Sequence, residues 1–315
     1  MEIMTRFYNK PAAILTKPLQ IGEFSSHANL GFESNARNLR YLIHVEKDFE
    51  PLFNLDAGFN NFFAKDPTDC ENDLIHLQEW AISERGKFSN DYKRVFRNAE
   101  MVCCRGTLTN IAQTPYYSKD PWRMVAVRHE GIIYIHSCGA TDGMSFCYPE
   151  NPLDAHLTYW GHSFQRIMTS RNYDYAMLGG FDDSEIVDCR ETYSAVYRSD
   201  IIKPNGDKIK LAYSSEIKAV DENNKFVDFK TQDSHNYNGN WLKKSWYWWF
   251  QSHFSAVDRV YVGFRSELGI VHNIRVAERS YLRKHAGSRC DVVLNIVTDV
   301  LSEVKKRCVD SLEVR

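Results

Sequence analysis

The stretch SSEIKAVDENNKFVDFKT, from Ser214 to Thr231, most constrains the fold, because it reads as a strand, a tight polar turn and a second strand. Side chains two residues apart in a strand share one face. The first strand therefore places Glu216 beside Lys218, and the second places Asp228 beside Lys230. The Asp-Glu-Asn-Asn sequence between them is typical of a hairpin loop. The stretch predicts a hairpin on which two carboxylates and two ammonium groups gather.

Carboxylates and a lysine in this arrangement are typical of nucleases. Enzymes that cut phosphodiesters with Mg²⁺ hold the ion with oxygen ligands and use a nearby Lys to orient water or stabilise charge. The second strand, Asp228-Phe229-Lys230, fits such a site. The first strand does not, since Lys218 stands where a second carboxylate is expected. Two solvated strands of an ordinary hairpin explain the same residues, so the rest of the chain decides between them.

Composition excludes several classes of protein. The 315 residues are 43% hydrophobic and 25% charged, as in a soluble globular protein, and no segment reaches the roughly 18 to 20 uncharged apolar residues of a membrane helix. The N-terminal sequence MEIMTRFYNK has no apolar core of a signal peptide, which predicts an intracellular protein of the nucleus or cytoplasm that is not secreted. Eight cysteines without a C-x-x-C pair indicate neither a disulfide framework nor a zinc site.

The formal net charge of −2 gives no global basic signature, so RNA binding requires a local groove. Hydrophobic periodicity predicts helices over residues 157–170, 241–254 and 292–306, and strand character in MVCCRGTLTNIA from Met101 onward. No linker divides the chain. The preferred architecture is α+β, with two mixed β-sheets flanked by helices in a single domain that spans residues 1–315, with its core over about residues 19–308.

Several segments together resemble the DXO family of RNA 5′-end decapping nucleases in their order, spacing and residue identities. They are CRGTLTNIAQTPY, YWGHSFQRIM, SSEIKAV with FVDFKT, KKSWYWWFQSHF and VYVGFRSELGIV, and the resemblance runs from about Ile21 to Cys308. It implies two mixed sheets with surrounding helices. It also implies an activity that removes incomplete or NAD-type caps and 5′-triphosphate ends and degrades RNA with Mg²⁺ or Mn²⁺. The expected partners are RNA 5′ ends or nucleotides, without DNA or membrane, and the resemblance leaves a protein partner unidentified.

The resemblance carries functional roles to particular positions. It assigns the catalytic positions to Glu216, Asp228, Lys230 and Gln251. It assigns substrate contacts to Arg105, Lys218 and Gln165, with Arg105 facing the RNA phosphates. Any metal would be bound by Glu216, Asp228 and the main-chain carbonyl of Phe229.

The departures from the family pattern concern its metal ligands. Four family carboxylates, formally −4, correspond here to Gln165, Glu216, Lys218 and Asp228, which together carry −1. At about 4 Å and an effective dielectric constant of about 20, two unit charges interact by roughly 4 kcal/mol, so the ammonium of Lys218 repels a divalent cation. We expect metal binding to be weak or lost, with Lys218 lying between Glu216 and Asp228 and holding them together.

These departures predict an RNA 5′-end binding or regulatory protein whose catalysis is weak or absent. The alternative is a working Mg²⁺- or Mn²⁺-dependent decapping nuclease in RNA 5′-end quality control, with coordination rebuilt from Glu216, Asp228 and another acid. A third interpretation keeps only the scaffold, as a protein-interaction module. Candidates for another acid are Asp182, Asp183 and Glu191, whereas the segment Glu185-Ile186-Val187-Asp188 is interpreted as solvated surface.

Overall fold

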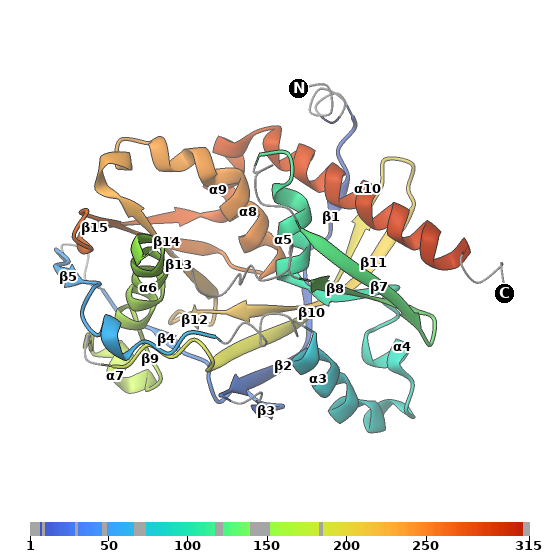
Figure 1. The fold of residues 1–315 in the computed structure, drawn as a ribbon, viewed down its shortest axis with the longest axis horizontal. Helices are drawn as coiled ribbons and strands as arrows, with labels where there is room; N and C mark the ends of the chain where they lie inside the picture. Colours follow the sequence, from blue (N-terminus) through green and yellow to red (C-terminus); the bar gives the residue numbers. More distant parts are fainter. Residues whose placement is uncertain are drawn as a thin grey trace.

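Two mixed β-sheets form the body of the molecule in the computed structural model (Figure 1). The described residues are 7, 10–28, 31–45, 49–65, 74–116, 122–138, 152–182 and 185–310. The first sheet has the order β3 (Gly31–Glu33), β2 (Leu19–His27), β10 (Thr192–Ile202), β11 (Lys208–Ile217), β6 (Met101–Cys104), β8 (Ile132–Cys138) and β7 (Arg123–His129), and β1 (Ile14–Leu15) pairs with β10. Within it β6 runs parallel to both β11 and β8, and the other pairs are antiparallel.

The second sheet is also mixed. Its order is β5 (Phe53–Asn54), β15 (Ile270–Glu278), β14 (Arg259–Arg265), β13 (Phe226–Asp233), β12 (Ala219–Val220), β4 (Tyr41–Leu42) and β9 (Thr169–Ser170). The β13–β14 and β12–β4 pairs are parallel, and the other pairs are antiparallel. The predicted α+β architecture of two mixed sheets is therefore confirmed.

Helices surround the two sheets. They are α3 (Ile75–Arg85), α4 (Tyr92–Val95), α5 (Arg105–Gln113), α6 (Pro152–Ile167), α7 (Tyr173–Met177), α8 (Ser245–Phe254), α9 (Arg279–Ala286) and α10 (Arg289–Asp310), with 3-10 turns η1 (Phe59–Asn61), η2 (Gly86–Phe88), η3 (Ser234–Asn236) and η4 (Asn240–Lys244). The helix α10 packs against α5 and α8, and α6 packs against β13 (Figure 1). Within the described part of the chain, no helix is long and apolar enough to cross a bilayer.

The largest apolar cluster joins the two sheets. It contains Tyr197 and Tyr213 of the first sheet, Val260 and Val262 of the second, and the aromatic face of α8 between them. Trp246, Trp248 and Trp249 of α8 are almost fully buried, because large aromatic side chains remove the most apolar surface from water. The helix predicted over residues 241–254 is observed as α8 from Ser245, preceded by the 3-10 turn η4, and its aromatic side chains are part of the core.

A single residue joins β11 of the first sheet to β12 of the second. The strand β11 ends at Ile217 in the first sheet and β12 begins at Ala219 in the second, so Lys218 lies at the junction. The predicted turn is confirmed, because Asp221 Oδ1 accepts hydrogen bonds from the N–H groups of Asn223 and Lys225. The hairpin is shorter than predicted: only Ala219–Val220 pairs with β13, whereas residues 214–217 pair with β10.

The sequence-based prediction for residues 105–112 was wrong. Strand β6 ends at Cys104, and the helix α5 begins at Arg105. Threonine and isoleucine favour strands by local propensity, but here burial of Leu108, Ile111 and Ala112 in the core overrides that preference. The consequence for function is that Arg105 stands at the first turn of a helix.

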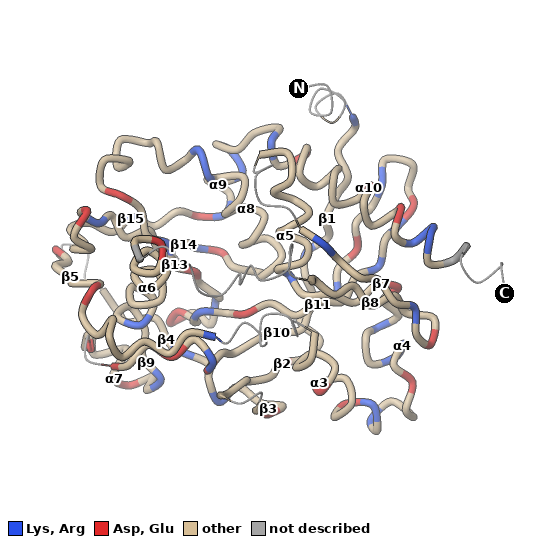
Figure 2. Tube along the Cα trace, in the orientation of Figure 1, with Lys and Arg blue, Asp and Glu red and all other residues tan. Residues whose placement is uncertain are grey.

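Basic and acidic residues are interspersed over both sheets and their helices (Figure 2). Neither sheet carries charge of a single sign, in keeping with the formal net charge of −2. Any attraction for a polyanion must therefore come from a local group of cations.

Replacing Gly22 with alanine should destabilise the fold. An added Cβ would lie 2.2 Å from Cζ2 of Trp80, whose ring is buried between α3 and the first sheet. We expect Gly22→Ala to lower the free energy of unfolding by about 1 to 3 kcal/mol, measured by urea denaturation. The matched control is Gly161→Ala on α6, where nothing lies within 4 Å and alanine should raise stability by up to about 1 kcal/mol. Equal stabilities would contradict this packing.

Candidate functional site

The candidate site forms where β11, the junction residue and β13 meet. Glu216 lies near the end of β11 and Lys218 at the junction, while Asp228 and Lys230 lie on β13, which contacts β11. All four side chains are partly buried. The structure therefore gathers the two carboxylates and two ammonium groups that the sequence predicts, although through a crossing between sheets.

Each carboxylate has its own lysine. The Nζ of Lys218 forms an ion pair with Oε1 of Glu216, and the Nζ of Lys230 lies 2.8 Å from Oδ2 of Asp228. The backbone N–H of Phe229 donates to Oδ1 of Asp228 at 2.8 Å. A third cation, Lys65, lies 4.0 Å from Oε2 of Glu216.

The pairing corrects one expectation. Lys218 was expected to lie between Glu216 and Asp228 and hold them together, yet among the described residues Lys218 forms an ion pair with Glu216 and none with Asp228. Asp228 still acts on Lys218 through its charge, because together with Glu216 it raises the pKa of the ammonium against the lowering effect of burial. Lys218 does not pair with Asp228 because Lys230 already forms an ion pair with that carboxylate.

The ionisation of the carboxylates follows from these contacts. Burial raises the pKa of Glu216, but the charges of Lys218 and Lys65 outweigh it and hold that pKa well below its usual range. The same opposition acts at Asp228, where Lys230 and then Lys218 overcome burial and lower the pKa. At neutral pH the site therefore holds two carboxylates against three ammonium groups, a local net charge of +1.

Gln165 reaches the same place from α6. It lines a narrow cavity of about 30 Å³ together with Glu216, Lys218 and His162. Burial and the charge of Lys218 lower the pKa of His162 to about 4, so its imidazole is neutral at physiological pH. The cavity thus combines an amide, a neutral imidazole and an ion pair.

Arg105 and Gln251 lie beside the strand that carries Glu216. Arg105 directly follows Cys104, which pairs with Ser214 of β11. Gln251 lies one turn before Ser255, whose hydroxyl is 2.7 Å from that of Ser215.

Both side chains carry an unused polar atom. Within the described part of the chain, Nε of Arg105 and Oε1 of Gln251 are buried and have no hydrogen-bond partner. Buried polar groups are usually satisfied, so these two atoms indicate a ligand or an ordered water.

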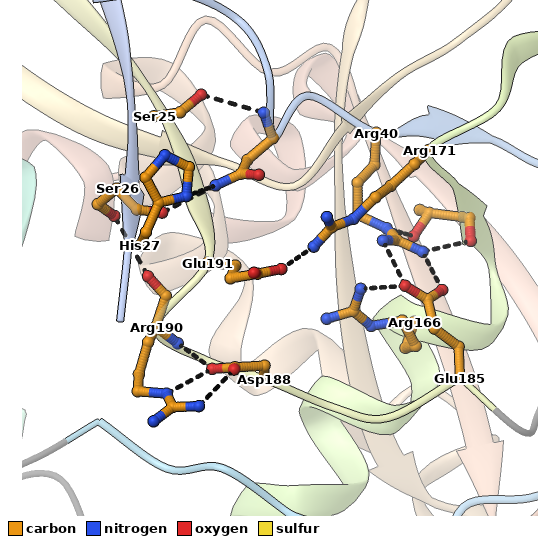
Figure 3. Close-up of polar contacts among 12 residues, drawn as sticks. Ser25, Ser26, His27, Arg40, Arg166, Arg171, Glu185, Asp188, Arg190 and Glu191 are labelled. Carbon is orange, nitrogen blue, oxygen red and sulfur yellow. Dashed lines mark hydrogen bonds and ion pairs between the residues drawn. The ribbon is translucent and has the colours of Figure 1, made fainter. Parts of the chain in front are cut away.

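An ion-pair network forms another wall of the narrow cavity (Figure 3). The guanidinium of Arg40, only 6% exposed, forms two hydrogen bonds with Glu185, at 2.7 and 3.1 Å. Arg166 on α6 contacts the same carboxylate at 2.7 Å. Arg40 also donates to Thr169, whose hydroxyl donates to the carbonyl of Gln165. The network therefore fixes the end of α6 that carries Gln165.

The interpretation of Glu185 and Asp188 as solvated surface was wrong. Glu185 is held by Arg40 and Arg166, which lower its pKa against the effect of burial. Asp188 forms a two-pronged pair with Arg190 and is mostly buried. The signal that sequence reasoning missed is Arg40 itself, a cation inside the apolar run NLRYLI, which requires a buried anion.

The structure places the three candidates for an additional acidic metal ligand differently. Glu191 lines the narrow cavity but is paired with Arg171. Asp182 lies on the loop after α7 and takes part in a polar contact, and Asp183 lies outside the described residues.

These donors do not fit a divalent cation. Mg²⁺ requires near-octahedral oxygen coordination and is repelled by ammonium groups. Glu216 and Asp228, the two carboxylates of the site, are each already paired with a lysine ammonium. Across the described ranges, no group of three or more His, Cys, Asp or Glu residues is arranged to hold a metal ion. Phe229, the expected carbonyl ligand, lies between Asp228 and Lys230 with its ring packed against Phe164.

Comparison with known proteins gives the family. The family described as "RAI1 like PD-(D/E)XK nuclease" matches residues 16–314. The chain is 30% identical over 226 residues to Decapping nuclease dom-3 of Caenorhabditis elegans, covering 70% of this chain and 56% of that protein. It is 25% identical over 282 residues to the Decapping and exoribonuclease protein of Homo sapiens, covering 85% of this chain and 68% of that protein. The chain thus spans little more than half of the nematode relative.

Solved structures share the fold. Scheffersomyces stipitis Rai1, in complex with (3′-NADP)⁺ and calcium ion, has a TM-score of 0.76 at 17% identity, over 94% of this chain and 85% of that one. Candida albicans Rai1, in complex with pU5-Mn²⁺, has a TM-score of 0.72 at 17% identity, over 94% and 84%. The family match thus confirms the resemblance drawn from the motifs, and these structures share the fold.

Removing the Lys218 ammonium should destabilise the protein most at neutral pH. The lowered pKa of Glu216 means that its ion pair contributes stability above the usual carboxyl pKa, and that this contribution is lost as the pH falls through the lowered value. We expect Lys218→Met to lower the free energy of unfolding by about 2 kcal/mol near pH 7, because it leaves a partly buried carboxylate with only the distant Lys65. The deficit should begin to shrink by pH 4, just below the usual carboxyl pKa, and shrink further as the pH falls toward the lowered value.

Urea denaturation at both pH values measures this effect. The double variant Glu216→Gln/Lys218→Met is the control, because it removes both charges and should lie closer to the natural protein than the single variant does. A single variant as stable as the natural protein at pH 7 would show that the ion pair contributes nothing.

Proposed function

Because this chain belongs to the RAI1-like PD-(D/E)XK nuclease family, we propose that it binds RNA 5′ ends, or nucleotides with the same phosphates, and that its hydrolytic activity is weak or absent. One observation carries the proposal: the ammonium of Lys218 is paired with Glu216. The resemblance places a metal-binding carboxylate of the family at position 218. In this account the protein's own cations bind phosphate, and the role of the protein is binding or regulation.

The ligands of related proteins support the phosphate part of the proposal. One solved relative is in complex with (3′-NADP)⁺ and calcium ion, and another with pU5-Mn²⁺. Both nucleotides carry phosphate, and both complexes contain a divalent cation. If the present chain binds the same class of ligand, its own lysines neutralise the phosphate, whereas those complexes contain a divalent cation.

The charges of the site suit direct phosphate binding. The local net charge of +1 from Lys65, Lys218 and Lys230 against two carboxylates attracts an anion and repels a divalent cation. Lysine binds phosphate as a point charge, and the buried, unpartnered Nε of Arg105 is suited to a phosphate oxygen at the first turn of α5. Lys230 and Arg105 are therefore assigned as phosphate contacts, and Gln251 as a donor or acceptor beside them.

The geometry suggests how hydrolysis would be impaired. Metal-dependent cleavage requires a cation that polarises the phosphoryl group and activates water. Here Glu216 and Asp228 are engaged by lysines. Gln165 offers a neutral amide where the resemblance places an acid of the family. The residues that remain can orient the 5′ end and neutralise its charge.

The alternative function is an active Mg²⁺- or Mn²⁺-dependent decapping nuclease. The observation that favours it is the position of Glu191, which lines the same narrow cavity as Glu216 and Gln165. Rebuilding a metal site would require Glu191 to leave Arg171 and Glu216 to leave Lys218.

Turnover separates the two functions. The natural protein and the variant Gln165→Glu/Lys218→Asp/Asp228→Glu are incubated with 5′-triphosphate, unmethylated-cap and NAD-capped RNA in Mg²⁺ and in Mn²⁺. We expect activity only in the triple variant, because it restores the four carboxylates of the family pattern. Robust turnover by the natural sequence would establish the active nuclease instead.

Binding without metal is the second test. Fluorescence anisotropy with 5′-monophosphate RNA in EDTA should show tighter binding than with 5′-hydroxyl RNA, and Lys230→Gln should weaken it about tenfold. Lys87→Gln is the matched control, because this exposed lysine lies beyond α3 and pairs with Glu84. Equal affinity for the two RNAs would favour the scaffold interpretation.

A further inference from the structure

A second hollow lies on the first sheet, apart from the candidate site. This groove of about 560 Å³, called here the α3–β7 groove, is lined by Leu74, Ile75, Gln78, Ala81, Ile82, Tyr92, Val125, Val127, His129, Tyr134 and His136. One wall comes from α3 and the other from the β7–β8 hairpin. In the sheet, β6 and β8 separate β7 from β11, which carries Glu216.

The walls of the groove expose apolar side chains. Ile82 is 52% exposed, Val125 46% and Val127 56%. The alternate residues of the same strand, Met124 and Ala126, are partly buried against the core, so β7 has one partly buried and one exposed apolar face. Exposed apolar residues gathered on one groove, in contrast to scattered ones, mark an interaction surface.

The strand β7 is also an open edge. Within the described strands it is the last of its sheet and pairs only with β8. Among the described residues, nothing pairs with the second side of its seven residues, which carries N–H and C=O groups. An extended peptide can add to such an edge, with main-chain hydrogen bonds for affinity and side-chain pockets for specificity.

The charges select the partner. Arg123 and Arg128 flank the two valines and form no ion pair with any described carboxylate. Pairing of β7 with β7 of a second copy, antiparallel and centred on Ala126, would place Arg123 opposite His129 without any acid. A carboxylate opposite an arginine stabilises a strand pair, and β7 contains none, so an acidic partner fits better than a second copy. Valines neither stack on bases nor bind phosphate, so a peptide also fits better than a nucleic acid.

From these observations we propose that the α3–β7 groove docks an extended acidic segment of a partner protein. The segment pairs with the free edge of β7, its alternate apolar side chains fill the groove beside Val125 and Val127, and its carboxylates meet Arg123 and Arg128. Docking there leaves the phosphate site at β11 and β13 accessible. The protein is then able to hold an RNA 5′ end and a partner at the same time.

Synthetic peptides test the proposal on the whole protein. A displayed library of extended peptides with alternate valine or isoleucine and flanking aspartates is screened, and its best binder is compared by fluorescence anisotropy with a shuffled peptide and with an aspartate-to-lysine peptide. We expect binding only by the acidic alternating peptide, together with slower hydrogen exchange of the β7 amides.

Variants locate the binding. Val125→Thr/Val127→Thr and, separately, Arg123→Gln/Arg128→Gln should each weaken the peptide about tenfold. Val276→Thr on β15 is the matched control, a strand valine that is 50% exposed outside the groove, and it should change nothing. Three results would overturn the proposal: no peptide of this class binds, the groove variants bind as the natural protein does, or the groove variants abolish self-association or RNA binding instead.

Discussion

The ion pair between Lys218 and Glu216 is the interaction on which the rest of the site depends. It lies at the residue that joins β11 of the first sheet to β12 of the second, so the place of this charge is fixed by the fold itself. Carboxylates held between packed sheets require a positive charge nearby, because an unpaired buried charge is costly. The resemblance implies that a divalent cation provides this charge in the family. Here two lysines provide it, one for each carboxylate, and the carboxylates remain ionised.

The same principle extends to the other wall of the narrow cavity. Arg40, Glu185 and Arg166 form a closed network that fixes the end of α6 (Figure 3). The hydroxyl of Thr169 connects this network to the main chain of Gln165. The charges of the walls are therefore satisfied internally. The atoms left for a ligand are on the side of Arg105 and Gln251, where a buried nitrogen and a buried oxygen lack partners within the described part of the chain. Paired acids beside an unpartnered guanidinium N–H of Arg105 suit binding of an anion more than coordination of a metal, and the Gln251 oxygen is left to accept a hydrogen bond from another part of the ligand.

Short-range sequence patterns predicted those elements whose structure depends on neighbouring residues. The turn after Val220 and the buried aromatic face of α8 follow from Asp and Asn chemistry and from tryptophan content. The helix at Arg105 was missed because its threonines favour strands and only the surrounding core makes them helical. The roles of Glu185 and Lys65 depend on contacts with residues far away in sequence, to Arg40 and Glu216, which no local pattern contains. The resemblance to the family brought the distant site residues together, whereas their pairing required the fold.

Anomalous diffraction from crystals soaked in Mn²⁺ tests the central claim most directly, because it locates the ion whether or not any RNA is cleaved. The account predicts no manganese peak between Glu216 and Asp228, with Lys218 still paired to Glu216, and a peak in crystals of the Gln165→Glu/Lys218→Asp/Asp228→Glu variant. A manganese ion coordinated by Glu216 and Asp228 in the natural protein, with the Lys218 side chain turned away, would contradict it.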